Sequence, residues 1–354
     1  EISACLVGSE MCIRDRVVPV LNASRTLPSF LEALLRLEPA PQEIILVDNG
    51  STDGSLSILQ TLAAKHPDRT IHILHEARRG ASAARNTGIR VATGEVIAFT
   101  DADCAPDAAW LQFLTVPFED RAVGAVAGRV VAAPASSTLE LFSALYTLHL
   151  PDRPARHRQW TPWGGGFPTA NLGVRRSLLD RLTGFDEEFK IYGEDHDLCA
   201  RLYALGCEIV YAPGACVAHH HRTMLPAMLR QAFGFGRAHP DLLRRHAARG
   251  LWLDLPRRSV RWGWFPARAW VDLASADKKI LAILVAGMVY GPLFFLFPLY
   301  AVWLTMSTRR RARQAGVDTS PRAALELAGF LVLKSAAMTA GRWWGSVRHG
   351  TLCF

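Results

Sequence analysis

Short apolar runs alternate with segments of helical periodicity through the first hundred residues of the chain. Continuous runs of this length are typical of strands that are buried on both faces of a sheet, and they occur at 17–21, 43–47, 70–74 and 96–99. Apolar residues at helical spacing or polar, glycine-containing turns mark the helices expected between them, at 26–37, 55–65 and 81–92. Strands and helices that alternate across short loops predict an α/β fold with a doubly wound, mostly parallel sheet and helices on both faces. Further strands are expected at 123–132, 170–174 and 208–211.

The pattern changes after about residue 251, where tryptophans alternate with arginines before a long apolar segment. The stretch 280–306 carries no charge over 27 residues, whereas about 20 are needed to cross a bilayer. Lysines precede this stretch and arginines follow it, so the positive-inside rule draws both of its ends to the cytoplasmic side. Its glycines and prolines are compatible with a re-entrant hairpin, so a span and a hairpin both remain open, and a buried core helix is the third alternative. The segment 323–340 predicts an interfacial helix.

Charge is distributed unevenly along the 354 residues. The net charge is +8, but residues 1–221 carry −6 and residues 222–354 carry +14. An acidic front joined to a basic, tryptophan-rich rear argues against nucleic-acid binding over the whole surface and favours an anionic membrane surface. The seven cysteines include no Cys-x-x-Cys pair, so neither a zinc knuckle nor a disulfide framework is indicated, as suits a reducing compartment.

Residues 1–16 do not fit this pattern. Arg14, Asp15 and Arg16 run directly into the first expected strand, where a buried strand requires apolar residues. The segment resembles translated sequencing-adapter sequence, and we treat it as an artefactual extension outside the fold. A genuine N-terminal extension is the alternative.

Two aspartates follow the fourth expected strand, Asp101 and Asp103 in the run Thr-Asp-Ala-Asp. Ligands of open α/β sheets bind at this carboxyl edge, and residues i and i+2 of an extended segment point the same way. Two carboxylates that converge repel each other unless a cation lies between them, so the pair predicts a divalent metal that bridges to a diphosphate. An isolated Asp-x-Asp that merely caps the next helix is the alternative.

Other polar groups fall at equivalent places. Pro19 and Asn22 end the first expected strand, and Asp48 ends the second. Downstream, Glu194 and Asp195 open a helix, where the helix dipole stabilises an ionised carboxylate that could act as a general base. A simple capping role for these acids is equally open.

The motifs together resemble a known family. Their order is Pro-x-x-Asn, Val-Asp-Asn-Gly-Ser-Thr-Asp, Ala-Arg-Asn-x-Gly, Asp-Ala-Asp, Gly-Phe-Asp, Gly-Glu-Asp-x-Asp-Leu and a strand-end histidine. This order is similar to that of the inverting family 2 glycosyltransferases of the GT-A fold, which use nucleotide-diphosphate sugars. The similarity covers 17–237, which we expect to be the catalytic domain, and leaves 238–354 as a basic, membrane-associated helical region.

The resemblance implies roles for individual residues. Asp48 would contact the nucleotide base in a pocket shaped by Pro19 and Asn22, with Arg85 on the nucleotide side. Asp101 would lie beside the ribose, and Asp103 would ligate Mg²⁺ or Mn²⁺. The metal set would be Asp101, Asp103 and His219, with His220 and His221 as substitutes for the histidine or all three as a mere surface cluster. Asp195 of the pair with Glu194 would be the catalytic base.

The resemblance also implies the acceptor side of the reaction. A lipid-linked or glycan hydroxyl would approach over the loop 163–167, which contains Trp163 and Gly165, and over Asn171. A flexible connector is the alternative for this loop. Gln231 begins the Gln-x-x-Arg-Trp motif of processive synthases, but the Arg-Trp is missing here, which argues for transfer of a single sugar. Attachment to the bacterial inner membrane with a cytoplasmic catalytic domain follows as an expectation.

Three other functions fit the sequence less well. A nucleotidyltransferase needs a glycine-rich phosphate loop after the first strand, and 20–24 has no glycine. A haloacid-dehalogenase phosphatase usually has x-Thr after its Asp-x-Asp, where Cys104 and Ala105 stand here. A catalytically inactive, membrane-tethered scaffold that binds sugar nucleotides is the non-enzymatic alternative, although every expected acid is present.

Overall fold

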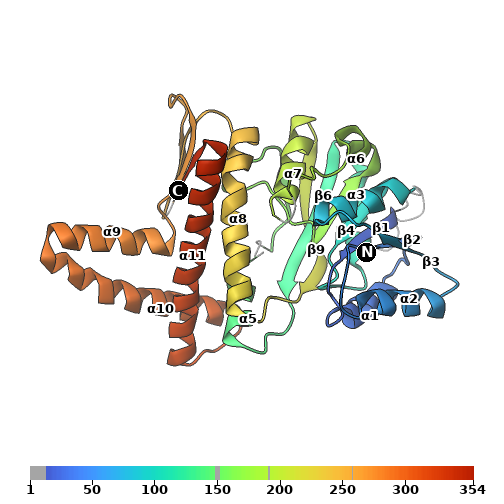
Figure 1. Ribbon diagram of the computed structural model, residues 1–354, viewed down its shortest axis with the longest axis horizontal. Coiled ribbons are helices and arrows are strands. Elements are labelled where there is room, and N and C mark those ends of the chain that lie inside the picture. The colour runs from blue at the N-terminus through green and yellow to red at the C-terminus, as the bar shows by residue number, and fades with distance from the viewer. Residues whose placement is uncertain (1–12, 148–151, 190–191, 257) are drawn as a thin grey trace. The chain divides into compact units, whose positions relative to one another are not determined.

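The computed structural model describes residues 13–147, 152–189, 192–256 and 258–354. The chain divides into two compact units (Figure 1). Among the described residues, the first unit contains 13–131, 152–160, 165–189 and 192–220. The second unit contains 132–147, 161–164, 221–256 and 258–354. The domain boundary expected at 238 stays a prediction.

The first unit is built on one mixed sheet of nine strands, whose main order is β3-β2-β1-β4-β8-β6-β9-β5, with β7 paired to β9. The strands are β1 (Ile13–Val20), β2 (Glu43–Asp48), β3 (Thr70–His75), β4 (Val96–Thr100), β5 (Cys104–Pro106), β6 (Val123–Ala132), β7 (Ala155–His157), β8 (Asn171–Arg175) and β9 (Glu208–His219). The first four are parallel, whereas β8 runs antiparallel to β4 and to β6. The α/β sheet is therefore confirmed, and its parallel part is the upstream half.

Helices of the first unit follow the strands as expected through residue 100. They are α1 (Leu27–Leu35), α2 (Ser55–Lys65), α3 (Ala81–Val91), α4 (Trp110–Thr115), η1 (Val116–Glu119), α6 (Arg176–Leu182) and α7 (Glu194–Ala204). Helix α3 packs directly over β1, because Gly88 faces Val17 with no room for a Cβ atom. This close approach brings the middle of α3 down onto the sheet and explains the glycine of the Ala-Arg-Asn-x-Gly motif.

The first strand begins earlier than expected. Strand β1 starts at Ile13 and therefore takes in charged residues that we had placed outside the fold. Asp15 accepts a hydrogen bond from the Gly94 amide at 2.7 Å. Arg16 is completely buried, and its guanidinium nitrogens have no hydrogen-bond partner among the described residues. The start predicted at residue 17 was wrong. Asp15 and Arg16 lie in the buried core, where a strand ordinarily carries apolar residues.

The second unit is organised around two long helices. Its helices are α5 (Thr138–Tyr146), α8 (Leu225–His246), α9 (Ala276–Val289), η2 (Gly291–Phe295), α10 (Leu296–Gln314) and α11 (Pro321–His349). Helices α8 and α11 approach closely, because Gly236 meets the Met338 carbonyl and Gly341 meets the Phe233 carbonyl with no space for a Cβ atom. The predicted helix at 323–340 is thus part of α11 and packs along α8.

The tryptophan-rich stretch forms a small sheet, β10 (Gly250–Leu255), β11 (Arg258–Trp262), β12 (Arg268–Asp272) and β13 (Leu352–Cys353), in the order β11-β10-β12-β13. Trp252 and Trp270 are buried as neighbours on paired strands, whereas Trp262 and Trp264 are exposed. The apolar segment 280–306 is broken at 290–295 and is therefore not one continuous helix. By length and composition, two helical stretches among the described residues could cross a membrane, Gly291–Gln314 and Pro321–His349.

Candidate active site

A buried arginine joins two of the predicted carboxylates. Arg85, on α3, donates to Asp101 beyond β4 at 2.9 Å and to Glu194 at the start of α7 at 3.0 Å. The guanidinium is only 3% exposed, and a buried cation of this kind requires paired acids. The structure therefore brings the strand-end aspartate and the Glu-Asp pair to opposite sides of one side chain. Arg85 was expected on the nucleotide side, which stays a prediction; its guanidinium pairs with both carboxylates.

The two acids of the Glu-Asp pair differ in environment. Burial, together with the negative charge of Asp195, raises the pKa of Glu194 to about 8. Asp195 is partly exposed, and its carboxylate accepts a hydrogen bond from the His196 amide at 2.8 Å. Gly193 precedes them with φ of +96°, which favours glycine and turns the chain into α7. Of the two acids, Asp195 is the one open to a ligand.

A second cluster contains potential metal ligands. Asp103, Cys104 and His219 each offer one donor atom, and these atoms lie within 4.8 Å of one another. The His219 Nε2 atom is 3.5 Å from the Asp103 carboxylate. Cys104 and His219 are directly opposed on the antiparallel strands β5 and β9, so their side chains share one face. Of the three candidate histidines, His219 is thus the one placed beside Asp103, while the His220 amide donates to the Asp103 carbonyl.

Polar side chains lie together at the ends of β1 and β2. Asp48 is 2% exposed, accepts from the Gly50 amide at 3.2 Å and lies 3.3 Å from the His75 ring. Asn22 has φ of +49° and accepts from the Thr52 amide at 2.8 Å, which ties the two strand ends together. Pro19, the penultimate residue of β1, pairs with Val47 in the parallel register. The three predicted residues therefore lie on neighbouring strand ends.

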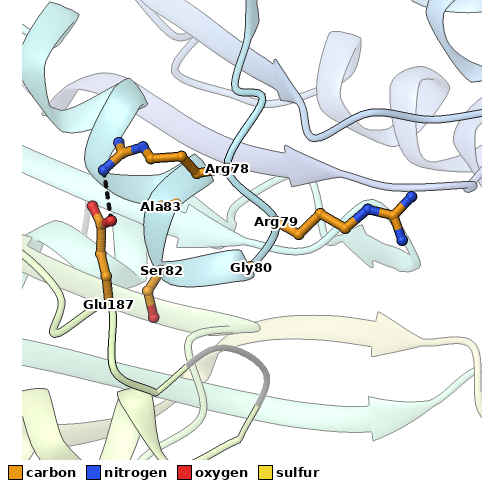
Figure 2. Close-up of a pocket in the computed structure, with 6 residues that line it drawn as sticks. All are labelled: Arg78, Arg79, Gly80, Ser82, Ala83 and Glu187. Atoms are coloured by element: carbon orange, nitrogen blue, oxygen red, sulfur yellow. Dashed lines mark hydrogen bonds and ion pairs between the residues drawn. The ribbon is translucent and has the colours of Figure 1, made fainter.

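A pocket of about 390 Å³ opens beside the start of α3 (Figure 2). It is lined by Arg78, Arg79, Gly80, Ser82, Ala83 and Glu187. Figure 2 shows Arg78 paired with Glu187, whereas Arg79 extends away from this pair. The exposed Arg79 and the amide end of α3 give this rim a positive character.

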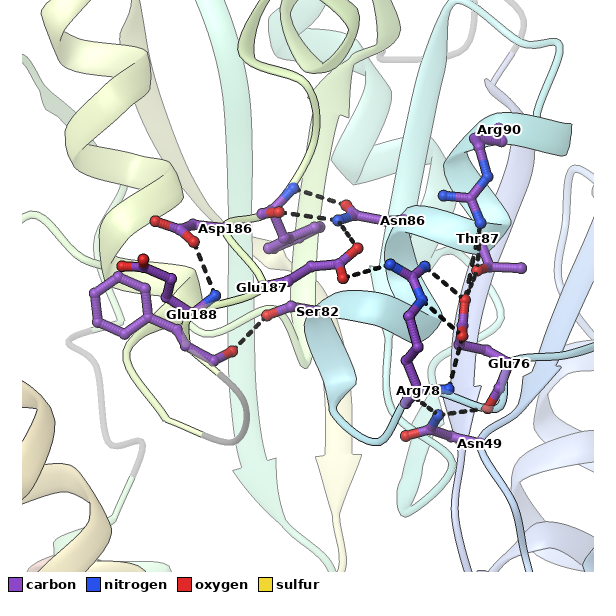
Figure 3. Close-up of polar contacts among 12 residues, drawn as sticks. Asn49, Glu76, Arg78, Ser82, Asn86, Thr87, Arg90, Asp186, Glu187 and Glu188 are labelled. Carbon is purple, nitrogen blue, oxygen red and sulfur yellow. Dashed lines mark hydrogen bonds and ion pairs between the residues drawn. The ribbon is translucent and has the colours of Figure 1, made fainter.

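A hydrogen-bond network holds the Gly-Phe-Asp turn against α3 (Figure 3). The Asn86 side chain donates to the Phe185 carbonyl at 2.9 Å and accepts from the Phe185 amide at 2.8 Å. Arg78 bridges Glu76, at 2.8 Å, and Glu187, at 2.7 Å, and its hydrogen bonds lower the pKa of Glu76 to about 2. The turn that precedes the acids of α7 is therefore fixed to the same helix that carries Arg85.

The three residues predicted for the acceptor side lie in different environments. Asn171 is fully buried. Its side-chain amide donates to the Arg129 and Ala215 carbonyls and accepts from the Trp110 ring. Contrary to the prediction, it therefore does not face a ligand. Trp163 belongs to the second unit, where its ring packs on Trp252 at 4.8 Å. Gly165 has φ of +87° and lies against the Gln159 carbonyl, a conformation that only glycine adopts easily.

Sequence reasoning missed Cys104, Arg78 and Glu187. Cys104 follows Asp103 directly, and its place opposite His219 depends on a pairing between strands far apart in the chain. Arg78 and Glu187 are separated by more than a hundred residues and carry no local signal of their contact.

Comparisons with known proteins agree with this geometry. Residues 16–183 match the family described as glycosyl transferase family 2. The pre-mycofactocin glycosyltransferase of Mycobacterium tuberculosis is 35% identical over 232 residues, which are 64% of this chain and 47% of that protein. Glycosyltransferase AglE of Haloferax volcanii is 25% identical over 248 residues, which are 67% of this chain and 78% of that protein. The chain spans about half the length of the mycobacterial relative.

A solved structure shares the fold. Mannosyltransferase PcManGT from Pyrobaculum calidifontis, in complex with GDP-Man and Mn²⁺, superimposes with a TM-score of 0.59 at 21% identity, over 93% of this chain and 86% of that one. The fold is thus the GT-A type, a sheet with strand-end carboxylates at its open edge. Residues 16–183 of the chain are therefore similar to glycosyl transferase family 2.

Proposed function

We propose that this protein transfers one sugar from a nucleotide-diphosphate sugar to a hydroxyl of a lipid-linked or glycan acceptor, with inversion at the anomeric carbon. The observation that carries the proposal is the double ion pair of Arg85, because one guanidinium spans the donor-side Asp101 and the Glu194 that adjoins the proposed base. Donor-side and base-side acids are thereby within reach of a single substrate.

The donor would bind along the upstream strand ends. Asp48 would contact the base, with Asn22 and Pro19 around it, and Asp101 would lie beside the ribose. Ligands of open sheets bind where the strand order reverses, which here is between β1 and β4. Arg79 at the positive rim of α3 would attract the diphosphate.

The cluster at β5 and β9 fits a divalent ion. A carboxylate and an imidazole are suitable ligands for Mn²⁺, and Asp103 and His219 converge there, with Asp101 as the second acid of the motif. The bound ion, Mg²⁺ or Mn²⁺, would act as a Lewis acid that neutralises the departing diphosphate. The complexes with Mn²⁺ of PcManGT and of GalNAc-T7 lend support, although their similarity to this chain concerns the fold alone.

Asp195 would be the general base. A hydroxyl is a poor nucleophile until its proton is removed, and this needs an ionised, accessible carboxylate. Glu194 is unsuited, because it is buried and paired with Arg85, whereas Asp195 is partly exposed at the start of α7. With one base, a single displacement inverts the sugar, and no covalent carboxylate nucleophile is needed.

The protein would act at a membrane surface. The apolar helical stretch Gly291–Gln314 and the basic second unit support association with the bacterial inner membrane, with the first unit on the cytoplasmic side. A lipid-linked acceptor follows naturally from that location.

Nucleotide binding measured by calorimetry tests the proposal. UDP, GDP and dTDP are titrated with Mn²⁺ and again with EDTA. We expect metal-dependent binding of one nucleotide, lost in Asp103→Ala and retained in the control Asp68→Ala at an exposed site. Folded protein that binds none of the three would refute the donor assignment and favour the scaffold function.

The base is tested separately with Asp195→Asn. We expect this variant to bind nucleotide like the wild type and to lose sugar transfer, and the anomeric configuration of the wild-type product, measured by NMR, should be inverted. Full transfer activity in the variant would exclude Asp195 as the base.

A further inference from the structure

The apolar segment of the second unit folds back on itself. Helix α9 is followed by the short turn η2 and then by α10, and the two helices form an antiparallel hairpin (Figure 1). Gly287 lets the hairpin close, because the Phe294 ring occupies the space where a Cβ atom would lie. At the open end, the Lys279 ammonium lies 5.9 Å from the centre of the Trp303 ring, which joins the two helices again.

The closed end of the hairpin is apolar and exposed. No charged residue occurs at 280–306, and large side chains there face solvent instead of packing on the unit. Met288 is 72%, Val289 84% and Phe295 70% exposed. A continuous exposed patch of this kind at the tip of a projecting element marks an interaction site.

The open end of the hairpin is basic. Lys279 begins this end on α9, and Arg310, Arg311 and Arg313 complete it on α10. Tyr300 and Trp303 stack at 5.6 Å between the arginines and the apolar tip. Cations next to aromatic rings, with an apolar end beyond them, match the headgroup, interface and hydrocarbon layers of an anionic bilayer.

The length of the apolar part matches one leaflet. Residues 280–289 of α9 rise about 15 Å, and residues 296–306 of α10 rise about 16 Å, at 1.5 Å per residue. The hydrocarbon core of a bilayer is about 30 Å thick, so each arm reaches about its middle. The backbone of the turn is bonded as lipid requires, since the Tyr290 amide donates to Ala286 and the Leu293 amide donates to Tyr290, both at 2.9 Å.

Helix α11 differs, although it is also long and apolar. Its Lys334 ammonium donates to the Tyr146 carbonyl at 2.7 Å, and its Arg342 pairs with Asp272 at 2.8 Å. Both cations are thus bound by other segments of the second unit, and α11 packs along α8. Helix α11 is therefore bound into its unit along one side, while side chains such as Trp343 and Val347 are exposed.

From these features we infer that the α9–η2–α10 hairpin inserts into a single leaflet of an anionic bilayer, with its tip near the bilayer centre and its basic end among the headgroups. The bilayer is the occupant because the tip of the hairpin is uncharged, as the hydrocarbon requires, and its open end is cationic, as the phosphates of an anionic membrane favour. The inference rests on the membrane association proposed above and not on sugar transfer.

Co-flotation of the full-length protein with phosphatidylcholine/phosphatidylglycerol vesicles tests the insertion. Val289→Asp/Phe295→Asp places two charges at the tip, and we expect about 5,000-fold weaker binding, at about 70-fold for each charge at the centre of a membrane. The matched control, Leu325→Asp/Val347→Asp, changes two exposed apolar residues of α11 and should bind like the wild type. Equal loss in both pairs, or in neither, would overturn the inference.

The depth is measured with a fluorophore on Val289→Cys, with labelling of the parent protein as background. We expect strongest quenching by doxyl groups near the ends of the acyl chains and little by aqueous iodide. Strongest quenching near the headgroups would overturn the single-leaflet depth. A dimer that shields the tip without vesicles, seen as a doubled mass that Val289→Asp/Phe295→Asp abolishes, would assign the patch to a second copy of the chain.

The basic end has its own readout. Arg310→Gln/Arg313→Gln should weaken binding to anionic vesicles about 25-fold, at about fivefold for each charge, and leave binding to neutral vesicles unchanged. Because these readouts need no nucleotide, the hairpin inference and the proposed activity can fail independently.

Discussion

Replacing Arg16 should stabilise the protein. Arg16 is fully buried in β1, its guanidinium has no hydrogen-bond partner among the described residues, and its nearest compensation is the Trp110 ring, whose centre lies 5.8 Å away. Arg16→Met keeps a long, flexible side chain in the same space and removes the buried charge.

The size of the effect follows from the pKa. Burial, together with the positive charge of Arg69, lowers the pKa of Arg16 from its ordinary value to about 9. A fall of this size corresponds to about 5 kcal/mol against the folded state, and loss of the contact with Trp110 offsets about 1–2 kcal/mol. We therefore expect Arg16→Met to raise the free energy of unfolding by about 3–4 kcal/mol, or the melting temperature by roughly 10 °C.

Urea and thermal unfolding of both proteins across pH measure this gain. A lowered pKa in a base destabilises the folded state while the group is charged, so the gap between variant and wild type should be constant below about pH 8 and narrow above about pH 9. Arg175→Met is the control, because Arg175 donates to the Val123 and Phe118 carbonyls, and this variant should be less stable than wild type. An Arg16→Met protein no more stable than the wild type would refute the conclusion that Arg16 is a destabilising, unpaired charge.

Three further predictions concern the site and the helix pair. Burial raises the pKa of Glu194 to about 8, so the free energy of unfolding of the wild type should fall between about pH 4.5 and about pH 8. Glu194→Gln should remove this fall in urea titrations, and a variant with the wild-type pH profile would contradict the prediction. Arg85→Met leaves two carboxylates without their cation, so it should cost about 3–5 kcal/mol in unfolding experiments and lower kcat more than it raises KM, with partial recovery in Arg85→Lys. Gly236→Ala should destabilise the second unit by about 1–3 kcal/mol, whereas Gly329→Ala, which meets open space, should be neutral or stabilising in the same melts.

The upstream half of the fold could be predicted from the sequence because its signals are local. The strand that ends at Asp48 and the strand that precedes Asp101 are continuous apolar runs, and the structure places both within a residue of the expected ends. The same holds for the helix that opens at Glu194. Strand ends on a parallel sheet share one edge, so Asp48 and Asp101 were expected at the same edge.

Features that depend on contacts between distant segments could not be predicted. The choice of His219 over its two neighbours depends on the register of β9 with β5. Asn171 has the chemistry of a ligand residue, but the antiparallel placement of β8 buries it inside the sheet. The break at Tyr290 favours the hairpin over a span, whereas the glycines around it are compatible with both.

The backbone ladder between β5 and β9 also determines how the protein responds to chelation. Because main-chain hydrogen bonds hold Asp103 and His219 together, the free energy of metal binding is not needed to fold the site. Removal of the ion with EDTA should therefore leave the melting temperature of the ligand-free protein nearly unchanged, unlike in small zinc domains that unfold without metal. Loss of the metal would then inactivate the protein reversibly, and sugar transfer would resume when the ion binds again.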